Sequence, residues 1–374
     1  MPFLKLFLLP IAFFYGLVVF IRNIFFDYGI FSSKEYSVPI ISVGNLCSGG
    51  SGKSPLVEYI LKLIDNKAGL AVLSRGYGRD SSGFQWVSEK SIVKDVGDEP
   101  LQIARKFPDV NVAVSENRNN GIQHIIHDEC DLILLDDAFQ HRWVKPGLNI
   151  LLTTYDNLFI NDHLLPFGSL RESKNNFKRA DIIVVTKTPY PLLPLDEYRL
   201  KEQIAPFFHQ KLCYSYLNYL PPISLFSEND IQFEGKKVIL LTAIASSQNL
   251  YDYVNSNSEI VEHFDFRDHY SFKKKDIKKI IECYNKIDSQ EKLILTTEKD
   301  ATRLALYESY FKDVSIAYIP IEFKFQGKTN FNELILKYVE QNRVDSKVPR
   351  AENALQTQGG YYFRYRIGRT NPKN

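Results

Sequence analysis

The chain has 374 residues, 44% of them hydrophobic, and a formal net charge of +2. This length and composition allow two folded domains and exclude disorder throughout the chain, while the near-neutral charge gives no indication of a nucleic-acid partner and nothing indicates a required protein partner. The four cysteines, Cys47, Cys130, Cys213 and Cys283, form no CxxC pair, so reduced thiols in a cytoplasmic compartment are expected rather than a zinc site or a disulfide framework.

An uncharged apolar stretch, Leu6–Ile21, lies near the N-terminus between two basic residues. It is shorter than the about 20 helical residues that cross a hydrocarbon core, and Pro10 and Gly16 are expected to interrupt it. A membrane-associated helix, a buried core helix and a signal peptide are the open interpretations, although no small-residue cleavage site follows. We expect a membrane-associated helix within residues 1–30.

From residue 38 onward, short apolar runs alternate with amphipathic segments. Uninterrupted apolar strands suit a sheet buried on both faces, and their alternation with helices favours parallel strands joined by right-handed crossovers. We therefore predict a mostly parallel α/β core over residues 31–215. Its expected strands are Pro39–Val43, Leu70–Leu73, Val110–Val114, Leu132–Leu135, Leu148–Leu152 and Ile182–Val185, and its clearest helices are Leu56–Ile64 and Pro100–Phe107.

A proline-containing break, Tyr219–Pro222, follows this first group. Around it we predict the start of a second, smaller α/β domain over residues 216–345, because apolar runs and amphipathic segments alternate again. Residues 346–374 are polar without periodicity and are expected to be a disordered tail. The expected strands of the second domain are Lys237–Leu241, Ile260–Phe264, Lys292–Leu295 and Val314–Ile319, and its helices are Lys274–Asn285 and Asn332–Gln341.

The segment Gly49-Gly50-Ser51-Gly52-Lys53-Ser54, here the glycine-rich loop, directly follows the first predicted strand. Phosphate binding needs backbone N–H groups directed at one anion; glycines let the chain approach it, Lys53 can neutralise phosphate oxygens and Ser54 can ligate Mg²⁺. The strict P-loop pattern has glycine where Cys47 stands, so a merely flexible loop is the alternative. The strand before the loop and the helix expected after it favour an ATP site and a P-loop NTPase-like core.

A pair of carboxylates, Asp136-Asp137, ends the apolar run Leu132–Leu135. P-loop enzymes hold Mg²⁺ with a loop hydroxyl and an acidic residue at the end of a neighbouring strand. A solvated strand end or a helix cap is the alternative. Because ligands bind at the carboxyl edge of such sheets, we predict a Mg²⁺ site formed by Ser54, Asp136 and Asp137.

Further short motifs accompany the loop in a fixed order. They are Val43-Gly44-Asn45, Ser74-Arg75-Gly76-Tyr77-Gly78, Gly97-Asp98-Glu99-Pro100, Asp136-Asp137-Ala138-Phe139-Gln140-His141-Arg142 and Thr297-Glu298-Lys299-Asp300. Together they resemble the tetraacyldisaccharide 4'-kinase family, over residues 10 to 340 approximately. The chain departs from the family pattern at Ala138, where the family usually has glycine, and at Ala243–Ser247, where the family has a Gly-Ile-Gly-Asn-Pro-like turn. We expect altered loop geometry there rather than lost chemistry.

The resemblance implies transfer of the γ-phosphate of ATP to the 4'-hydroxyl of a tetraacyldisaccharide 1-phosphate, giving lipid IVA in lipid A biosynthesis. It also implies two α/β domains facing each other across a nucleotide cleft, and an N-terminal helix at the cytoplasmic face of the inner membrane. By resemblance, Asp98 is the catalytic carboxylate and His269 its partner. The residues alone favour a helix cap for Asp98 and an ordinary surface or core position for His269.

The remaining site residues come from the loop motif and from charged residues near strand ends or in polar loops, except that Asp27, Asn45, Gln140 and His141 are carried over from matching positions of the family. The expected ATP-binding residues are Gly49, Gly50, Ser51, Gly52, Lys53, Ser54 and Arg171, with Lys53 also catalytic. The expected lipid-binding residues are Asp27, Asn45, Arg75, Arg118, Gln140 and His141, and Glu172 is an expected outer metal ligand. Each of Arg75, Arg118 and Arg171, taken singly, is explained as a solvated surface charge. Together they could neutralise ATP phosphates and the 1-phosphate of the acceptor.

Rival functions remain open from the residues alone. One is a membrane-bound P-loop switch or transport ATPase, although Thr186-Lys187-Thr188-Pro189 lacks the acid of a guanine-binding motif. A soluble small-molecule kinase and a non-enzymatic nucleotide-binding anchor are the others. Consumption of ATP that depends on a lipid-linked sugar separates all of them from the expected kinase.

Overall fold

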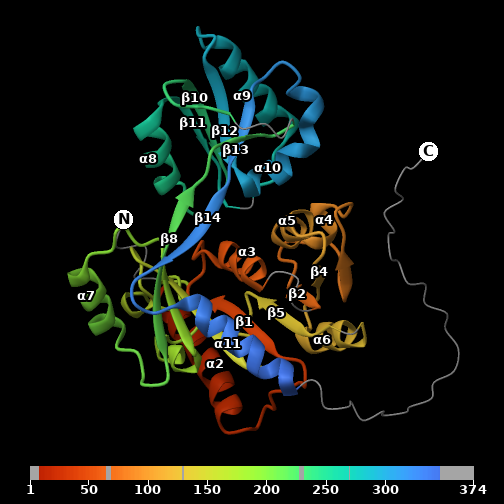
Figure 1. Ribbon diagram of the computed structural model, residues 1–374, viewed down its shortest axis with the longest axis vertical. Coiled ribbons are helices and arrows are strands. Elements are labelled where there is room, and N and C mark those ends of the chain that lie inside the picture. The colour runs from red at the N-terminus through yellow and green to blue at the C-terminus, as the bar shows by residue number, and fades with distance from the viewer. Residues whose placement is uncertain (1–7, 65–68, 129, 227–230, 269, 346–374) are drawn as a thin grey trace, which may run out of the picture.

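The computed structural model describes residues 8–64, 69–128, 130–226, 231–268 and 270–345. Within these residues the chain forms two sheets, each covered by helices, and the smaller unit lies above the larger one in Figure 1. The expected tail, residues 346–374, lies outside the described residues. The α/β fold class predicted from the sequence is confirmed.

The larger sheet has the strand order β14-β8-β7-β6-β1-β5-β2-β4-β3. Its central strands are parallel, whereas β3 and β14 pair antiparallel with β4 and β8. All residues of β1, β2, β5 and β7 are buried, as expected for strands covered on both faces. The strands are β1 Ile40–Asn45, β2 Leu70–Ser74, β3 Gln85–Val87, β4 Asn111–Val114, β5 Leu132–Asp136, β6 Leu148–Thr154, β7 Ile182–Thr186, β8 Lys211–Tyr219 and β14 Ile321–Gln326.

Helices cover both faces of this sheet. On one face, apolar side chains of α3 and α11, including Leu56, Ile60 and Ile335, pack in one core cluster with strand residues such as Ile41 and Val43. On the other face lie α6 and α7. The helices are α3 Lys53–Ile64, α4 Val93–Val96, α5 Asp98–Lys106, α6 Arg118–His127, α7 Pro194–Ile204 and α11 Phe331–Asp345, with 3₁₀ turns η1 Phe159–Asn161 and η2 Lys174–Arg179.

The smaller unit is a sheet of order β11-β10-β12-β13-β9, parallel except at β9. Its β10 and β12 are almost wholly buried. The elements are β9 Ile223–Ser224, β10 Lys237–Thr242, α8 Gln248–Asn257, β11 Glu259–Asp265, α9 Lys274–Lys286, β12 Lys292–Thr297, α10 Glu298–Leu304, η3 Ala305–Tyr310 and β13 Ile316–Ile319.

The predicted limits of the second domain differ from the structure at both ends. The expected boundary after residue 215 falls inside β8, and β14 returns the chain to the larger sheet by pairing with β8 from Tyr219↔Ile321 to Tyr214↔Gln326. Figure 1 shows these two strands running side by side between the units. Helix α11, expected in the second domain, instead packs on α3 because its apolar face, with Phe331 and Ile335, completes the first core.

The N-terminal helix α2, Leu9–Asp27, is continuous, so the expected interruptions at Pro10 and Gly16 are wrong. Pro10 lies in the first turn, where no N–H is needed, and Gly16 permits close packing because a Cβ there would lie 2.8 Å from Leu164 Cδ1. The helix is long and apolar enough to cross a membrane by length and composition. Most of it is exposed, with Phe13 at 67% and Val18 at 66%, which disfavours a buried core helix.

Candidate active site

The glycine-rich loop joins β1 to α3 at the carboxyl edge of the larger sheet. Gly49 and Gly52 have φ values of 116° and 88°, a region that suits glycine because it has no Cβ. Lys53 begins α3, and its Nζ lies 3.2 Å from Asn45 Oδ1 and 3.7 Å from Asp137 Oδ1. The loop therefore has a cation at its base and a helix N-terminus behind it, an arrangement that suits phosphate.

Asn45 was expected at the lipid, but the structure buries it beneath the loop. Its Nδ2 donates to Ser51 Oγ at 2.8 Å, and its Oδ1 accepts from Lys53. From the other side, Thr186 Oγ1 at the end of β7 donates to the Ser51 carbonyl at 2.8 Å. In the structure its side chain holds the loop, because Asn45 is the last residue of β1 and lies directly under it; the expected lipid contact stays a prediction.

Asp136 and Asp137 end β5 next to the loop, as expected. Asp136 is 4% exposed, and burial, with a smaller contribution from Asp137, raises its pKa to about 6. One of its oxygens accepts from Ser74 Oγ at 3.3 Å, and the other is buried without a hydrogen-bond partner among the described residues. Burial alone would raise the pKa of Asp137, but Lys53 and Arg171 outweigh it and hold the pKa below its ordinary value.

Arg171 was expected to contact ATP. Its two terminal nitrogens lie 3.1 and 2.8 Å from the two oxygens of Asp137, and it also donates to the Asn45 carbonyl at 3.0 Å. The guanidinium therefore lies at the loop but is committed to a bidentate ion pair.

Glu172 was expected to be an outer metal ligand, and in the structure its carboxylate lies among side chains that donate to it. It is 1% exposed, and its oxygens accept from four side chains: Asn23, Gln140, Asn176 and Arg179. A carboxylate whose two oxygens already accept hydrogen bonds from side chains holds those side chains in place. Nor do the described residues contain a group of three or more His, Cys, Asp or Glu side chains that could hold a metal ion.

The expected lipid-binding residues lie around the loop after β5. Arg118 is buried, donates to the Ser115 and Asp136 carbonyls, and has an Nε atom with no partner among the described residues. His141 Nδ1 is likewise buried without a described partner. Burial, then the charges of Arg118, Arg22 and Arg75, lower the pKa of His141 to about 4, so it is neutral near pH 7.

The remaining lipid-binding expectations divide between exposed and committed side chains. Arg75 is exposed at the end of β2. Asp27 forms an ion pair with Arg142 at 2.8 Å, and Gln140 Nε2 donates to the Asn45 carbonyl and to Glu172. Arg75 is therefore open to a ligand, whereas Gln140 belongs to the scaffold of the loop.

Asp98 lies in the first turn of α5, 6% exposed, and faces the second unit. The helix N-cap is Gly97, at φ 91°, so the expected cap role of Asp98 is corrected. Its Oδ2 lies 3.7 Å from Arg303 Nε of α10. His269, its expected partner, lies outside the described residues.

Other cross-unit contacts were not predicted from the sequence. Glu298 pairs with Lys106 at 2.6 Å and Lys299 with Glu99 at 2.9 Å, so α10 is bound to α5 by two ion pairs. The motif Thr297-Glu298-Lys299-Asp300 was recognised but given no role. The alternating acidic and basic residues of this motif could have indicated ion pairs to another element. No sequence pattern marked Arg303, which lies three residues beyond Asp300.

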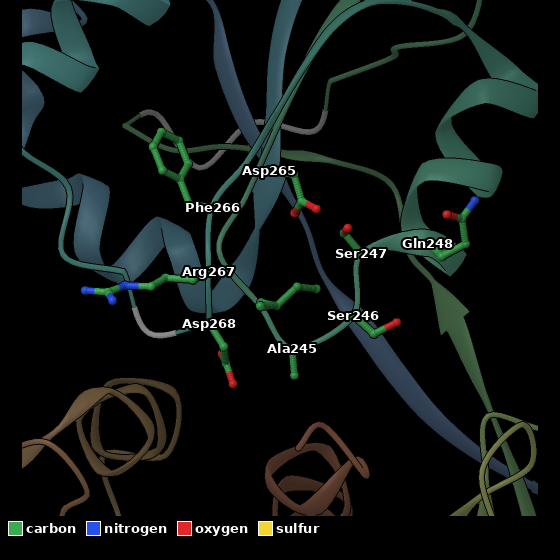
Figure 2. Close-up of a pocket in the computed structure, with 9 residues that line it drawn as sticks. Ala245, Ser246, Ser247, Gln248, Asp265, Phe266, Arg267 and Asp268 are labelled. Carbon is green, nitrogen blue, oxygen red and sulfur yellow. The ribbon is translucent and has the colours of Figure 1, made fainter. Parts of the chain in front are cut away.

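A pocket of about 440 Å³ opens at the carboxyl edge of the smaller sheet (Figure 2), between the start of α8 and the end of β11. Its lining is mainly polar and comprises Ile244, Ala245, Ser246, Ser247, Gln248, Asp265, Phe266, Arg267 and Asp268. The pocket is next to the glycine-rich loop, because a Cβ on Gly50 would lie 3.2 Å from Ala245 Cβ and 4.0 Å from Lys187 Nζ.

Lys187 was also missed from the sequence. It follows β7 with φ 56°, an uncommon conformation for a residue with a side chain, and burial lowers its pKa. Backbone strain of this kind often accompanies ligand sites. Lys187 thus adds a second lysine beside the loop.

Comparisons with known proteins agree on one family. A family model described as tetraacyldisaccharide-1-P 4'-kinase matches residues 4–340. Among curated relatives, the tetraacyldisaccharide 4'-kinase of Bacteroides thetaiotaomicron is 39% identical and covers 94% of this chain and 97% of its own length. That of Parabacteroides distasonis is 40% identical, covering 89% and 94%. The crystal structure of LpxK from Aquifex aeolicus, described as an "apo" form in complex with ATP, is 28% identical with a TM-score of 0.69 and covers 90% of this chain and 99% of that one.

Proposed function

The chain belongs to the tetraacyldisaccharide 4'-kinase family, and we propose that it transfers the γ-phosphate of ATP to the 4'-hydroxyl of a tetraacyldisaccharide 1-phosphate. The product is the bis-phosphorylated lipid A precursor, lipid IVA. One observation carries the proposal: the glycine-rich loop presents Lys53 beside the Asp136-Asp137 pair, 3.7 Å from Asp137. Kinases of this class need phosphate binding, charge neutralisation and a positioned acceptor.

ATP would lie across the two units. The loop would hold the β- and γ-phosphates through its backbone N–H groups and Lys53. The pocket next to Ala245 would hold the ribose and the base, with Asp265 and Gln248 as hydrogen-bonding groups. Lys187 would neutralise further phosphate charge from the end of β7. The closeness of Gly50 to Ala245, whose Cβ would lie 3.2 Å from a Cβ added at Gly50, supports this continuous path.

Mg²⁺ fits the same edge of the sheet. The unpartnered buried oxygen of Asp136 and the Ser54 hydroxyl at the start of α3 are hard oxygen donors of the type Mg²⁺ prefers, and Mg²⁺ commonly takes only one or two carboxylates besides phosphate and water. The small number of acidic groups is therefore no obstacle. When bound, the ion supplies neutralisation of the phosphate charge. We propose Ser54, Asp136 and Asp137 as its residues and leave out Glu172.

The acceptor would lie on the other side of the loop, near α2. Arg75 and Arg118 provide positive charge for its 1-phosphate. The N–H at Arg118 Nε has no partner among the described residues and could donate to that phosphate. Neutral His141, with an unpartnered Nδ1, can accept a hydrogen bond from a sugar hydroxyl. Asp27 is the last residue of α2 and forms an ion pair with Arg142.

Asp98 is the proposed base for the 4'-hydroxyl. It lies at the meeting point of the two units, buried opposite Arg303. A carboxylate there can accept the hydroxyl proton as the oxygen attacks phosphorus. By family resemblance, His269 would orient or tune this carboxylate.

The outer face of α2 would hold the enzyme at the inner membrane. Phe13, Phe14 and Val18 are each more than 60% exposed, and an apolar helix face of this kind binds the boundary between headgroups and acyl chains. The acceptor itself is a lipid, so anchoring beside the site brings enzyme and substrate to one surface.

The test is an assay with purified protein, ATP, Mg²⁺ and separate acceptors. Tetraacyldisaccharide 1-phosphate should be phosphorylated, and the same lipid already bearing a 4'-phosphate, free glucosamine and no acceptor should not. ATP consumption at equal rates with and without the lipid would support a switch or transport ATPase and contradict the kinase.

A further inference from the structure

Helix α2 is apolar, yet one of its few buried side chains is polar. Asn23 is 5% exposed, and the other buried residues of the helix are Ala12 and Phe26. Burying an amide without hydrogen bonds is costly. Asn23 avoids this because its Nδ2 donates to Glu172 Oε2 at 3.2 Å, and its Oδ1 accepts from Arg142 at 3.3 Å.

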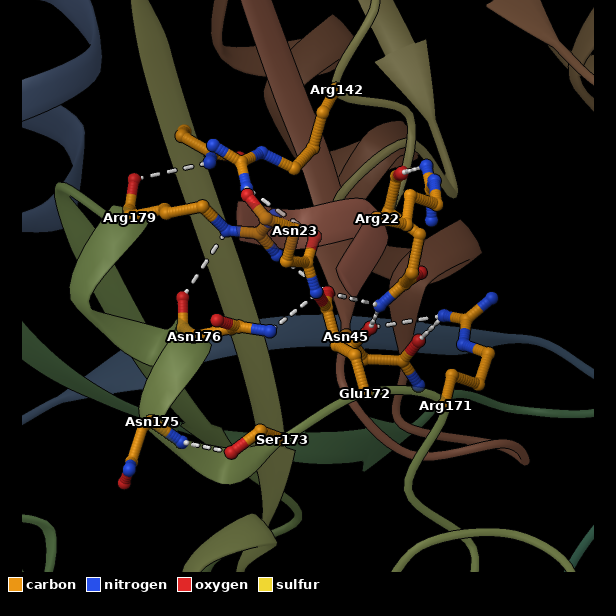
Figure 3. A network of polar contacts seen from close by, with 12 residues as sticks. Arg22, Asn23, Asn45, Arg142, Arg171, Glu172, Ser173, Asn175, Asn176 and Arg179 are labelled. Carbon is orange, nitrogen blue, oxygen red and sulfur yellow. Dashed lines mark hydrogen bonds and ion pairs between the residues drawn. The ribbon is translucent and has the colours of Figure 1, made fainter. Parts of the chain in front are cut away.

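Glu172 connects this helix to the interior of the site, and Figure 3 shows it between Asn23 and Asn45. Its Oε1 accepts from Gln140 Nε2 at 3.1 Å, and the same amide nitrogen lies 2.8 Å from the Asn45 carbonyl. Asn45 in turn holds Ser51 and Lys53 of the glycine-rich loop. An unbroken set of polar contacts therefore runs from Asn23 through Glu172, Gln140 and Asn45 to the loop.

Two further hydrogen bonds from α2 end on the backbone of Arg171 and of Gln140. Tyr15 Oη donates to the Arg171 carbonyl at 2.7 Å, and Arg22 donates to the Gln140 carbonyl at 2.6 Å. Arg171 and Gln140 are the residues that reach the Asn45 carbonyl. The helix thus binds the two supports of Asn45 and not only the outside of the protein.

We propose that Asn23 is a positioning residue for phosphoryl transfer: through Glu172 and Gln140 it fixes Asn45, and Asn45 fixes Ser51 and Lys53. Helix α2 is then part of the scaffold of the nucleotide site as well as the element that faces the membrane. The inference rests on the proposed function only in assuming that ATP binds at the loop.

Replacing Asn23 should remove one hydrogen bond to Glu172 without leaving the buried carboxylate of Glu172 unpaired. Glu172 keeps Arg179 and Asn176, the latter at 2.7 Å from Oε2, so its carboxylate remains paired and hydrogen-bonded. A variant at position 23 is therefore expected to fold, with its effect on the loop rather than on the core.

The experiment uses the full chain in detergent and measures the affinity for ATP by fluorescence titration without acceptor, kcat/KM for ATP with acceptor, and thermal unfolding. Asn23→Leu and the smaller Asn23→Ser are compared with Asn255→Leu, an exposed asparagine of α8. For both position-23 variants we expect a loss of about tenfold in ATP affinity, the size typical of one buried hydrogen bond. The control should match the wild-type chain.

Gln140→Leu supplies the second arm. Because it cuts the same path, it should weaken ATP binding similarly, and the Asn23→Leu/Gln140→Leu double variant should be no weaker than the worse single variant. Additive losses, or wild-type ATP affinity in a folded position-23 variant, would overturn the proposal. ATP affinity does not depend on the acceptor, so failure of the lipid assay alone would count against the proposed reaction and leave this result intact.

Discussion

Arg303 Nε lies 3.7 Å from Asp98 Oδ2, and both side chains are buried although they belong to different units. Arg303 is itself held by Asp300 at 2.6 Å and by the Tyr270 carbonyl at 2.9 Å. Asp300 is fixed by the Ala243 N–H and the Thr297 hydroxyl. Arg303 of the smaller unit therefore shapes the environment of the proposed base, and we expect the reaction to require both units together.

Asp98→Asn should reduce kcat by about 10²- to 10⁴-fold, the usual contribution of a general base. ATP affinity should change little, because Asp98 is not part of the loop. Steady-state kinetics and an ATP titration measure the two quantities, with Asp109→Asn, an exposed aspartate, as the matched control. A fully active, folded Asp98→Asn protein would leave this residue with a structural role only.

Lys53→Ala should abolish phosphoryl transfer while the protein remains folded. The lysine supplies the fixed positive charge at the β/γ-phosphates, and it is mostly buried beside Asp137. Lys62→Ala removes an exposed lysine from the last turn of the same helix and should leave turnover unchanged. Turnover near the wild-type value in Lys53→Ala, with an unchanged melting curve, would refute the assignment of the loop.

Asp136→Asn and Asp137→Asn should each weaken activation by Mg²⁺. Both side chains end β5 beside the loop, and a neutral amide is a poorer ligand for a hard cation than a carboxylate. The measurement is initial rate against Mg²⁺ concentration at fixed ATP, where the half-saturating concentration should rise. Asp109→Asn, at an exposed aspartate, should not shift this concentration, and unshifted curves for both variants at positions 136 and 137 would contradict the proposed metal site.

Acidification should destabilise the protein partly through His141. Its pKa is about 4 in the folded chain and about 6.5 in an unfolded one, so between these values the unfolded chain binds a proton that the folded chain does not. Stability is therefore unaffected by this group above about pH 6.5 and falls as pH decreases toward 4.

The measurement is urea unfolding of the wild-type chain and His141→Gln at pH 7.5 and 4.5. The variant should lose less stability on acidification, by about 2–3 kcal/mol. Equal losses of unfolding free energy in the two proteins would show that the pKa of His141 is not lowered in the folded chain.

The exposed face of α2 should control membrane binding. Replacing Phe13, Phe14 and Val18 by serine removes the apolar area available to lipid, and each such side chain is worth roughly 1.5–3 kcal/mol when fully buried. Sedimentation with anionic lipid vesicles should fall strongly, with an unchanged melting temperature. Leu306→Ser, at a residue 70% exposed on the second unit, is the control; unchanged sedimentation of the triple variant would place the anchor elsewhere.

Much of the fold could be predicted because its signals are local. Runs such as Leu132–Leu135 are apolar at every position, and the structure buries them completely. The glycine-rich loop and the family resemblance were equally visible, and the family match confirms the predicted membership. Strand β8 and its partner β14 were missed because Lys211–Tyr219 mixes polar and apolar residues, and its partner lies more than one hundred positions away.

The functions of individual polar residues were harder to predict. Glu172 contacts Asn23 across 149 positions of sequence, so nothing near Glu172 indicates that its oxygens are occupied. Asn45 was assigned to the lipid because its motif was recognised, but burial under Ser51 is a property of the folded loop. Family resemblance located these residues at the site without telling which of them touch ligand and which hold their neighbours.

The pairing of β8 with β14 makes the smaller unit an insertion into the larger one. Tyr219 and Ile321, where the chain leaves and re-enters, are directly paired across the two strands. During synthesis, the first core must wait for β14 and for Phe331, Ile335 and Val339 of α11, which emerge from the ribosome only after the whole insertion. We therefore expect the nascent chain to expose an unfinished apolar face beside α3 until α11 has emerged, an interval in which association with other chains competes with folding.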